Sequence, residues 1–596
     1  LVTKSRWAVG CTAATANGQP GEGFVAVSPD GTKYYMDVLL FKKTDGIAEG
    51  GGGALHRRVA TMVASHVVDR FGNSVTYTYD ANGNLTEVDG SDGRQVTLTY
   101  ESWQNPFKDT GGNYFDPPGY RVHSITVQPA SAAPRSWTYT YDTTTDPVIP
   151  RLSAVTLPDG SSWQFHLAGF APLPGDGSLI SNQGCDYTLR PQDAVISSGS
   201  ITQPSGVTGT FTLRSTIRGR SNVPKVCLNP NTTPQLRFPA AYKSNSLIQR
   251  TLSGAGIGTQ TWTYTYSSPN DSWAPCTGCA TSVSTEMVDP SNRTTRYTFS
   301  NSFDASESLL LKSEFFTAGD TSTLVRSEAS NYALPPASGP WPYPWPQTLG
   351  RSAVLAVNAD QMGRLTPVNQ KTTVQDNDTY LWTANAFDAF ANPTQATRSN
   401  SITGQAALVE TTTFLNDTSN WVLGLPQTVT NVSPTLSAPE TESVNTYTAL
   451  DQLQSRSRFG QTLMSYTYDG LGQLATFTDP LNHTTTLSGY QRGLPTLVTY
   501  PDQTTEHIGV DAFGEVASVT DQNGNATTYS YDSVGRLEQI SYPAGDTVAW
   551  APKVFSYSFV GAAEQGVDAG HWRRTVTQGD GTATNYSQVT YFDALL

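Results

Sequence analysis

Hydrophobic and polar positions alternate in short runs along much of this chain. In the segment SWTYTYD, the aromatic residues Trp137, Tyr139 and Tyr141 are separated by Thr138 and Thr140. Successive side chains of a β-strand point to opposite faces of a sheet, so this alternation predicts a strand with one aromatic and one hydroxyl-bearing face. Asp, Asn, Pro and Gly, which favour tight turns, bound such runs. The pattern predicts an all-β chain of antiparallel strands and hairpins.

The turns recur at a constant spacing towards the C-terminus. Gly472, Gly493, Gly514 and Gly535 follow one another at intervals of 21 residues, in YTYDGLGQL, GYQRGLPTL, GVDAFGEVA and YSYDSVGRL. Each of these stretches runs into a β-favouring segment and a second turn. The repeating unit is therefore predicted to be a strand, a tight turn, a second strand and another turn.

The same unit occurs hundreds of residues earlier. DRFGNSVTYTYD at 69–80 matches DQNGNATTYSYD at 521–532 in the placement of both Asp residues, the Gly and both Tyr residues. The Asp carboxylate can accept hydrogen bonds from turn N–H groups, and the Gly can adopt a positive φ without a Cβ clash. The residues that we take to define the repeat are Tyr79, Asp80, Gly83, Tyr468, Asp469, Gly472, Gly493, Asp511, Gly514, Tyr531, Asp532 and Gly535.

A single two-stranded unit is only marginally stable, so neighbouring units are expected to pair edge to edge in one continuous sheet. Such a sheet twists, and winding it round on itself hides its edges. We therefore expect a long repeat array that spirals into a large hollow shell or barrel. Residues 54–69 permit a helix or a strand, and their position just before a clear repeat favours the strand.

Composition and charge argue against a nucleic-acid partner and against a membrane-spanning helix. The net charge is −14, and no run of Lys and Arg provides a local exception, so nucleic acid is not an expected partner. No stretch approaches 18 consecutive apolar residues, so we expect no membrane-spanning helix.

The sequence offers no catalytic constellation. Seven His residues are scattered without ligand spacing, and no G-x-S-x-G, phosphate-loop or H-E-x-x-H motif occurs. Cys276-Thr-Gly-Cys279 is an isolated C-x-x-C, for which a local disulfide or two free thiols is favoured over zinc. We predict no catalytic residues, no metal site and no cofactor.

The segments Tyr531–Leu537 and Tyr79–Leu85 resemble the YD repeat of bacterial Rhs proteins, whose core reads YD-x-x-G-R-L. GEGFVAVSPDGTKYYMD at 21–37 also resembles the stretch that precedes the repeats in that family. The resemblance covers most of the chain, and is poor at 100–135, 170–260 and 320–375.

The resemblance implies an architecture and a role. Rhs proteins, the related C component of insecticidal toxin complexes and the teneurins wind such repeats into a hollow β-shell. In bacterial members the shell usually holds a variable C-terminal toxin, released by aspartyl self-cleavage near a DPxGL-type motif. Asp289-Pro290 and Asp479-Pro480 begin in this way but do not continue with Gly-Leu. The self-cleaving core and the cargo are therefore expected to lie outside this chain.

The implied organisation is a pre-repeat β segment at 1–53 and a YD-repeat shell at 54–596, with irregular insertions at about 100–135, 170–260 and 320–375. The chain begins with Leu1 rather than Met, and we expect it to be part of a longer polypeptide.

Two functions follow as hypotheses. The first is the encapsulating shell of a secreted or surface-exported bacterial protein, polymorphic-toxin-like and not an enzyme. Its partners would be its own C-terminal cargo and an export-machinery or cell-surface partner. The alternative is a cell-surface adhesin or a carbohydrate- or partner-binding repeat protein. The Pro-rich segment PPASGPWPYPWP places Trp341, Tyr343 and Trp345 where they either pack against the shell or form an exposed contact site for glycans.

Overall fold

A computed structural model describes most of the chain. The described residues are 2–48, 54–104, 119–129, 132–144, 150–170, 196–228, 235–236, 238–333, 365–544, 550–579 and 584–593. Every regular element among them is a β-strand, which confirms the all-β prediction. None of them forms a helix long and apolar enough to cross a membrane.

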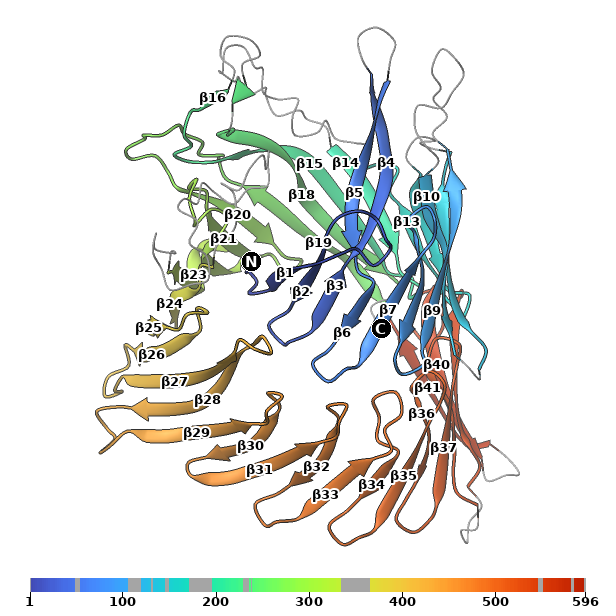
Figure 1. Cartoon of the computed structure of the whole chain (residues 1–596). Helices are drawn as coiled ribbons and strands as arrows, with labels where there is room; N and C mark the ends of the chain where they lie inside the picture. Colours follow the sequence, from blue (N-terminus) through green and yellow to red (C-terminus); the bar gives the residue numbers. More distant parts are fainter. Residues whose placement is uncertain are drawn as a thin grey trace.

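One sheet of 37 strands contains nearly all of these elements, and each strand pairs antiparallel with its neighbour in sequence (Figure 1). Its first part is β1 Ala8–Thr12, β2 Gly23–Val27, β3 Lys33–Met36, β6 His66–Val68, β7 Ser74–Tyr79, β8 Leu85–Gly90, β9 Gln95–Trp103, β10 Gly119–Gln128, β11 Arg135–Asp142, β12 Arg151–Thr156, β13 Ser162–His166, β14 Ile196–Thr202, β15 Thr208–Gly219, β18 Ala241–Gly254, β19 Ile257–Tyr266 and β20 Ser282–Val288.

The rest of the sheet follows the same antiparallel pattern. The remaining strands are β21 Arg293–Ser300, β22 Leu310–Ala318, β23 Asp320–Tyr332, β24 Val368–Gln375, β25 Asp378–Phe387, β26 Pro393–Asn400, β27 Leu408–Asp417, β28 Val422–Val432, β29 Glu440–Tyr447, β30 Leu453–Arg458, β31 Gln461–Tyr468, β32 Leu474–Thr478, β33 Thr484–Ser488, β34 Leu497–Thr499, β35 Thr505–Val510, β36 Val516–Thr520, β37 Ala526–Tyr531, β38 Leu537–Ser541, β39 Lys553–Val560, β40 His571–Gly579 and β41 Thr584–Phe592.

Two hairpins stand apart from the large sheet. β4 Val38–Ala48 pairs with β5 Ala54–Val63, and β16 Cys227–Leu228 pairs with β17 Gln235–Leu236. The ambiguous segment 54–69 is thus mostly strand, in β5 and β6, as its position favoured. Strands also occur in the ranges that resemble the repeat poorly, and β10, β14, β15, β18 and β19 belong to the large sheet.

The 21-residue period corresponds to two strands and two turns. Gly472 lies in the turn between β31 and β32, Gly493 between β33 and β34, Gly514 between β35 and β36, and Gly535 between β37 and β38. Adjacent units pair through the second turn of each, so the array grows by one hairpin per period, as a repeat architecture requires.

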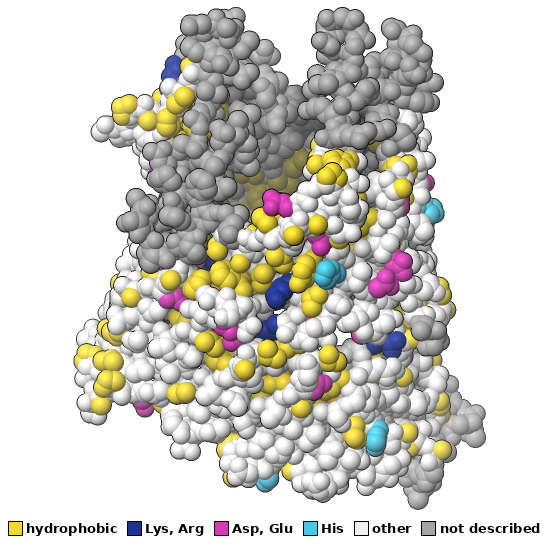
Figure 2. All heavy atoms as spheres, in the orientation of Figure 1, with side chains coloured by type: hydrophobic (Ala, Val, Ile, Leu, Met, Phe, Trp, Pro, Cys, Tyr) yellow, Lys and Arg dark blue, Asp and Glu magenta, His cyan; other side chains and the backbone are white. Residues whose placement is uncertain are grey.

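The sheet is a wall rather than the outside of a solid core. The accessible surface of the whole chain is 31,897 Å², for a mass of 64.1 kDa. A compact monomer of that mass would expose about 20,000 Å². Both faces of the wall therefore carry solvent-exposed side chains. The face seen in Figure 2 is hollowed in its upper half, where hydrophobic side chains line the recess.

The wall is curved, so strands from the beginning and end of the chain meet. In Figure 1 the turns below β2, β3 and β6 face the turns above the strands β30 to β35. An antiparallel bridge between Asp30 and Val422 joins the two parts directly. The described sheet is thus a spiral, and its second coil contacts the first through the turns that connect the strands.

A small buried cluster anchors one end of the long strands. Val223, Phe238, Ala240 and Phe303 pack together. Beside it Arg220, 1% exposed, pairs with Glu307 through N–O distances of 2.7 and 3.0 Å. Burial of an ion pair is tolerated when hydrogen bonds compensate the lost hydration, and here both Glu307 oxygens and the Pro239 carbonyl accept from Arg220.

Candidate functional site

The D-x-x-G turn is the unit from which the wall is built. The Oδ1 atom of Asp80 accepts hydrogen bonds from the N–H groups of Asn82 and Asn84, both at 2.8 Å, and its Oδ2 atom accepts one from the Asn84 amide at 3.0 Å. The N–H of Gly83 donates to the Asp80 carbonyl at 3.0 Å, and Gly83 has a φ of 77°. One carboxylate therefore satisfies the donors of the turn that the glycine closes.

Other turns of the repeat have the same hydrogen-bond pattern. The carboxylates of Asp69, Asp469, Asp511, Asp521 and Asp532 each accept from the N–H groups two and four residues later. The glycines at the fourth turn position all have positive φ: Gly72, Gly472, Gly514, Gly524 and Gly535. Gly493 also has a positive φ, of 85°, but its turn is closed by Gln491 and Leu494 without an Asp.

Hydrogen bonding favours the charged form of two of these carboxyls. The pKa of Asp521 is lowered by hydrogen bonds from the side chain and the N–H of Asn525. For Asp80, burial acts to raise the pKa, and the hydrogen bonds from Asn84 and Asn82 outweigh it, so the pKa is lowered. These two turns are therefore built around ionised carboxylates.

The tyrosine before the Asp links one unit to the previous one. The hydroxyl of Tyr468 donates to the Leu453 carbonyl at 2.8 Å, and that of Tyr531 donates to the Val516 carbonyl at 2.9 Å. Leu453 and Val516 lie at β-bulges, where the register of the preceding hairpin shifts. A bulge interrupts the ladder locally, and the tyrosine hydroxyl supplies a partner there.

This hydroxyl contact recurs along the wall. The same kind of bond, at 2.6 to 2.8 Å, joins Tyr79 to Ala64, Tyr100 to Leu85, Tyr141 to Val122, Tyr266 to Leu247, Tyr332 to Leu310, Tyr447 to Pro426 and Tyr490 to Leu474. On the other face of the sheet, hydroxyl side chains of neighbouring strands pair with each other, such as Thr467 with Thr476 at 2.7 Å. The aromatic stripe is thus a packing element of the repeat.

An ion pair joins the two coils of the spiral. Arg135, at the start of β11, binds Glu515 through two parallel N–O contacts of 2.8 and 2.9 Å. Its guanidinium lies 3.8 Å from the ring centroid of Phe513, and it also contacts the Asp532 carbonyl at 3.4 Å. Hydrogen bonding to Glu515 raises the pKa of Arg135 against the opposing effect of burial.

Further contacts extend this junction along the turns, and we call the whole row the seam. The Asn73 amide donates to the Leu471 carbonyl at 3.0 Å, and the Phe71 ring packs directly against Gly472. Other seam contacts are the Trp421 indole with the Arg6 carbonyl at 2.8 Å, Arg536 with Asp159 at 3.0 Å, and the Trp572 indole with the Pro204 carbonyl at 2.8 Å.

The seam pairs residues that lie several hundred positions apart, and this separation shortens along the chain. The separation is 415 residues for Arg6 and Trp421, 380 for Arg135 and Glu515, and 368 for Pro204 and Trp572. One coil of the spiral therefore takes roughly this length of chain. Sequence reasoning named Gly472 only as a repeat glycine and missed the seam itself, because no local pattern distinguishes Arg135 or Glu515 from other surface charges.

The remaining sequence predictions can now be located. Trp341, Tyr343 and Trp345 lie outside the described residues. Cys276 and Cys279 form a disulfide, one of the two favoured alternatives, and Cys11 is an exposed free thiol. No group of three or more His, Cys, Asp or Glu side chains that could hold a metal ion occurs within the described ranges.

Comparison with known families identifies the repeat. The family model described as RHS Repeat matches residues 64–105 and 510–547. The chain carries RHS repeats. The two matched segments contain β6 to β9 and β36 to β38, and they meet at the seam, where Arg94 lies beside Gly514. The relation to the Rhs/YD-repeat family expected from the YD motifs is thereby confirmed.

Comparison with curated proteins finds no match. Among solved structures, the chain is similar to a Tc holotoxin pore from Photorhabdus luminescens, with 10% identity, a TM-score of 0.27, and coverage of 98% of this chain and 32% of that one. A second similar structure is TcdB2-TccC3, with 10% identity, a TM-score of 0.22, and coverage of 98% and 35%. The chain spans about a third of the length of these chains.

Proposed function

We propose that this chain is a wall segment of a toxin-associated β-shell, and that the shell encloses a C-terminal cargo of the same polypeptide. The observation that carries the proposal is the seam. A sheet that only displayed its face would gain nothing from joining coils about 380 residues apart, whereas a container must close the gap between successive coils.

The construction of the wall supports a role in exclusion. Each strand of the large sheet is hydrogen-bonded to its neighbours, the tyrosine hydroxyls tie adjacent hairpins together, and the seam contacts join the coils. A folded or unfolded cargo behind such a wall would be separated from proteases and from the contents of the cell. The RHS repeats at 64–105 and 510–547 support the same role by family relation.

The proposed role is structural rather than catalytic. The repeat carboxylates, the most regular polar groups of the chain, are occupied by the N–H groups of their own turns. We further propose that the parent protein is exported from a bacterial cell and meets an export-machinery or cell-surface partner, as its Rhs relatives suggest.

Protection of the cargo tests the proposal. The parent polypeptide would be purified intact and treated with a broad-specificity protease, and the lifetime of its C-terminal region would be followed by mass spectrometry. We expect the C-terminal region to survive in the native protein. It should be degraded in a variant that lacks the central seam contact, Arg135→Ala combined with Glu515→Ala.

The matched control removes an ion pair away from the seam. Arg326 and Glu328 form a contact of 2.5 Å, with both side chains 46% exposed. Arg326→Ala combined with Glu328→Ala should leave the protection intact. Equal degradation of the C-terminal region in the native protein and the seam variant, at the rate of an isolated C-terminal fragment, would contradict enclosure.

A further inference from the structure

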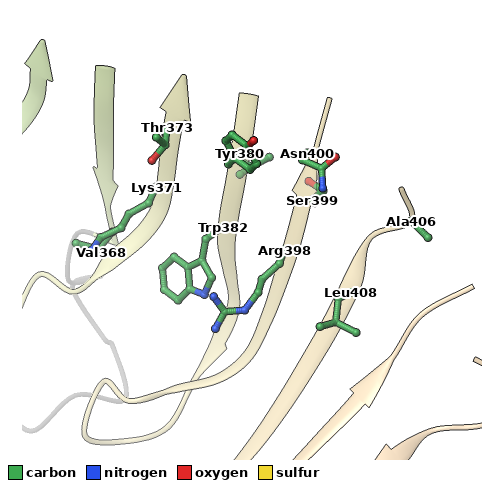
Figure 3. Close-up of a pocket in the computed structure, with 11 residues that line it drawn as sticks. Val368, Lys371, Thr373, Tyr380, Trp382, Arg398, Ser399, Asn400, Ala406 and Leu408 are labelled. Carbon is green, nitrogen blue, oxygen red and sulfur yellow. The ribbon is translucent and has the colours of Figure 1, made fainter. Parts of the chain in front are cut away.

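A groove on the face of the sheet has the chemistry of a ligand site that the shell role does not use. It has a volume of about 680 Å³ and crosses the strands β24, β25, β26 and β27. Figure 3 shows the side chains that line it, with the indole of Trp382 beside the guanidinium of Arg398. Lys371 lies on the neighbouring strand, on the other side of Trp382.

The register of the strands creates this arrangement. Lys371 is directly opposite Trp382, and Trp382 is directly opposite Arg398. Directly opposite residues lie about 5 Å apart at Cβ, so the indole is flanked by two cations in one row. Arg398 is in turn opposite Leu408, which ends the row.

A second row runs parallel to the first, two residues farther along each strand. It contains Thr373, Tyr380 and Asn400, paired in that order across the strands. Because strand side chains alternate, residues two apart share a face, so both rows open to the same side. The groove thus presents an aromatic plane, two cations, two hydroxyls and an amide.

The groups are accessible to a ligand. Tyr380 is 45% exposed and the side chain of Arg398 is 56% exposed. Arg398 contacts Glu410 at 3.3 Å through one terminal nitrogen, which leaves other guanidinium donors facing the groove. The nearby carboxylate of Glu328 is held by Arg326 at 2.5 Å.

We propose that this groove binds an acidic saccharide, a pyranose that carries a carboxylate. The C–H face of the sugar ring packs on the electron-rich face of Trp382. Lys371 and Arg398, on opposite sides of the indole, attract the carboxylates of the saccharide, and Thr373, Tyr380 and Asn400 bond to its hydroxyls. Two cations flank this indole, one on each neighbouring strand.

The same geometry argues against the other ligand classes. Peptides that bind a sheet in extended form hydrogen-bond to a free edge strand. The strands β24 to β27 are paired on both sides, so recognition must come from side chains alone. A purely apolar partner would cover Lys371 and Arg398 without compensating their lost hydration.

Titration calorimetry on the full chain tests the proposal, with tetragalacturonate as the acidic saccharide, maltotetraose as the neutral one and tetraglutamate as the acidic peptide. We expect tetragalacturonate to bind, and binding to weaken with added salt as ion pairs at an exposed site do. Trp382→Ala and Lys371→Ala should each weaken it by about tenfold or more.

A second cross-strand pair provides the matched control. Arg250 lies 3.9 Å from the ring centroid of Trp262, and the two residues are directly opposite each other in β18 and β19. Trp262→Ala should leave tetragalacturonate binding unchanged. A loss of binding in Lys371→Ala cannot be attributed to unfolding, because Lys371 is exposed and its removal leaves the packing of the sheet in place.

Three results would overturn the proposal. Absence of tetragalacturonate binding, or binding that Trp382→Ala leaves unchanged, excludes the groove as the site. Equal binding of tetraglutamate shows recognition of carboxylates without a sugar, and equal binding of maltotetraose shows that the acidic group is not required. None of these results bears on the enclosure of a cargo.

Discussion

Arg135 and Glu515 form a two-pronged ion pair although 380 residues separate them in the sequence. Their side chains are 13% and 21% exposed, so the pair lies largely out of solvent between the two coils. Parallel N–H···O bonds of this kind fix both distance and orientation. The pair therefore sets how the second coil of the spiral sits on the first.

Removing one partner of this pair should destabilise the wall. Arg135→Ala leaves the Glu515 carboxylate without its partner, and we expect a loss of about 1–3 kcal/mol, measured as a lower denaturant midpoint. Restoring the pair in reverse, as Arg135→Glu with Glu515→Arg, should recover part of the loss. Arg326→Ala, at an exposed pair, should change stability by less than about 1 kcal/mol. Equal losses for both single variants would show that the seam pair has no special role.

The tyrosine hydroxyl contact predicts a small, repeatable cost. Tyr468→Phe removes the donor to the Leu453 carbonyl and keeps the ring, so we expect a loss of about 0.5–1.5 kcal/mol in chemical unfolding. The control is Tyr586→Phe, because that hydroxyl bonds to the side chain of Gln588 on an exposed surface. A Tyr468→Phe variant as stable as the control would mean that water replaces the hydrogen bond to the Leu453 carbonyl without loss of stability.

Substitution of two glycines with the same backbone conformation distinguishes the cost of backbone strain from the cost of a lost packing contact. Gly472 has a φ of 80°, and a Cβ built there would lie 2.3 Å from the Phe71 ring. Gly524 has a φ of 84°, with no atom within 4 Å of that position. Gly524→Ala should cost about 1–2 kcal/mol from the left-handed backbone alone. Gly472→Ala should cost clearly more, because the substitution also displaces a seam contact, and equal losses would contradict that contact.

Alkaline pH should loosen the wall. Burial raises the pKa of Tyr79, Tyr468 and Tyr531 above the ordinary value. The folded state therefore favours the neutral phenol, and this contribution to stability is complete below about pH 10 and is lost as the pH rises through the raised values. Thermal midpoints measured across this range should fall together with the appearance of tyrosinate absorbance. Midpoints that stay level while tyrosinate appears would contradict the prediction.

Acid should also destabilise the wall, through the carboxylates of the turns. Hydrogen bonds from Asn525 lower the pKa of Asp521, and those from Thr504 lower that of Asp502. The contribution of these carboxylates is complete above about pH 4 and is lost as the pH falls through the lowered values. The thermal midpoint should fall in this window, and Asp521→Asn should flatten its dependence on pH slightly. An unchanged slope in that variant would show that Asp521 does not contribute.

The sequence alone was sufficient to predict the strand, the turn and the period, since each depends on residues within one 21-residue unit. Alternation in SWTYTYD gives the aromatic and hydroxyl faces, and Asp80 and Gly83 meet the hydrogen-bond and φ requirements of a single turn. The shared period of Gly472, Gly493, Gly514 and Gly535 then requires the units to pair edge to edge.

The tertiary structure decided which turns meet. The length of one coil depends on the twist and curvature accumulated over many strands, and no single unit encodes that sum. Arg135 therefore finds Glu515, and Phe71 packs against Gly472, only once the sheet has wound through a full coil. The same holds within the sheet for Trp382, which stands between Lys371 and Arg398 because the register of three strands, rather than any motif, brings them into one row.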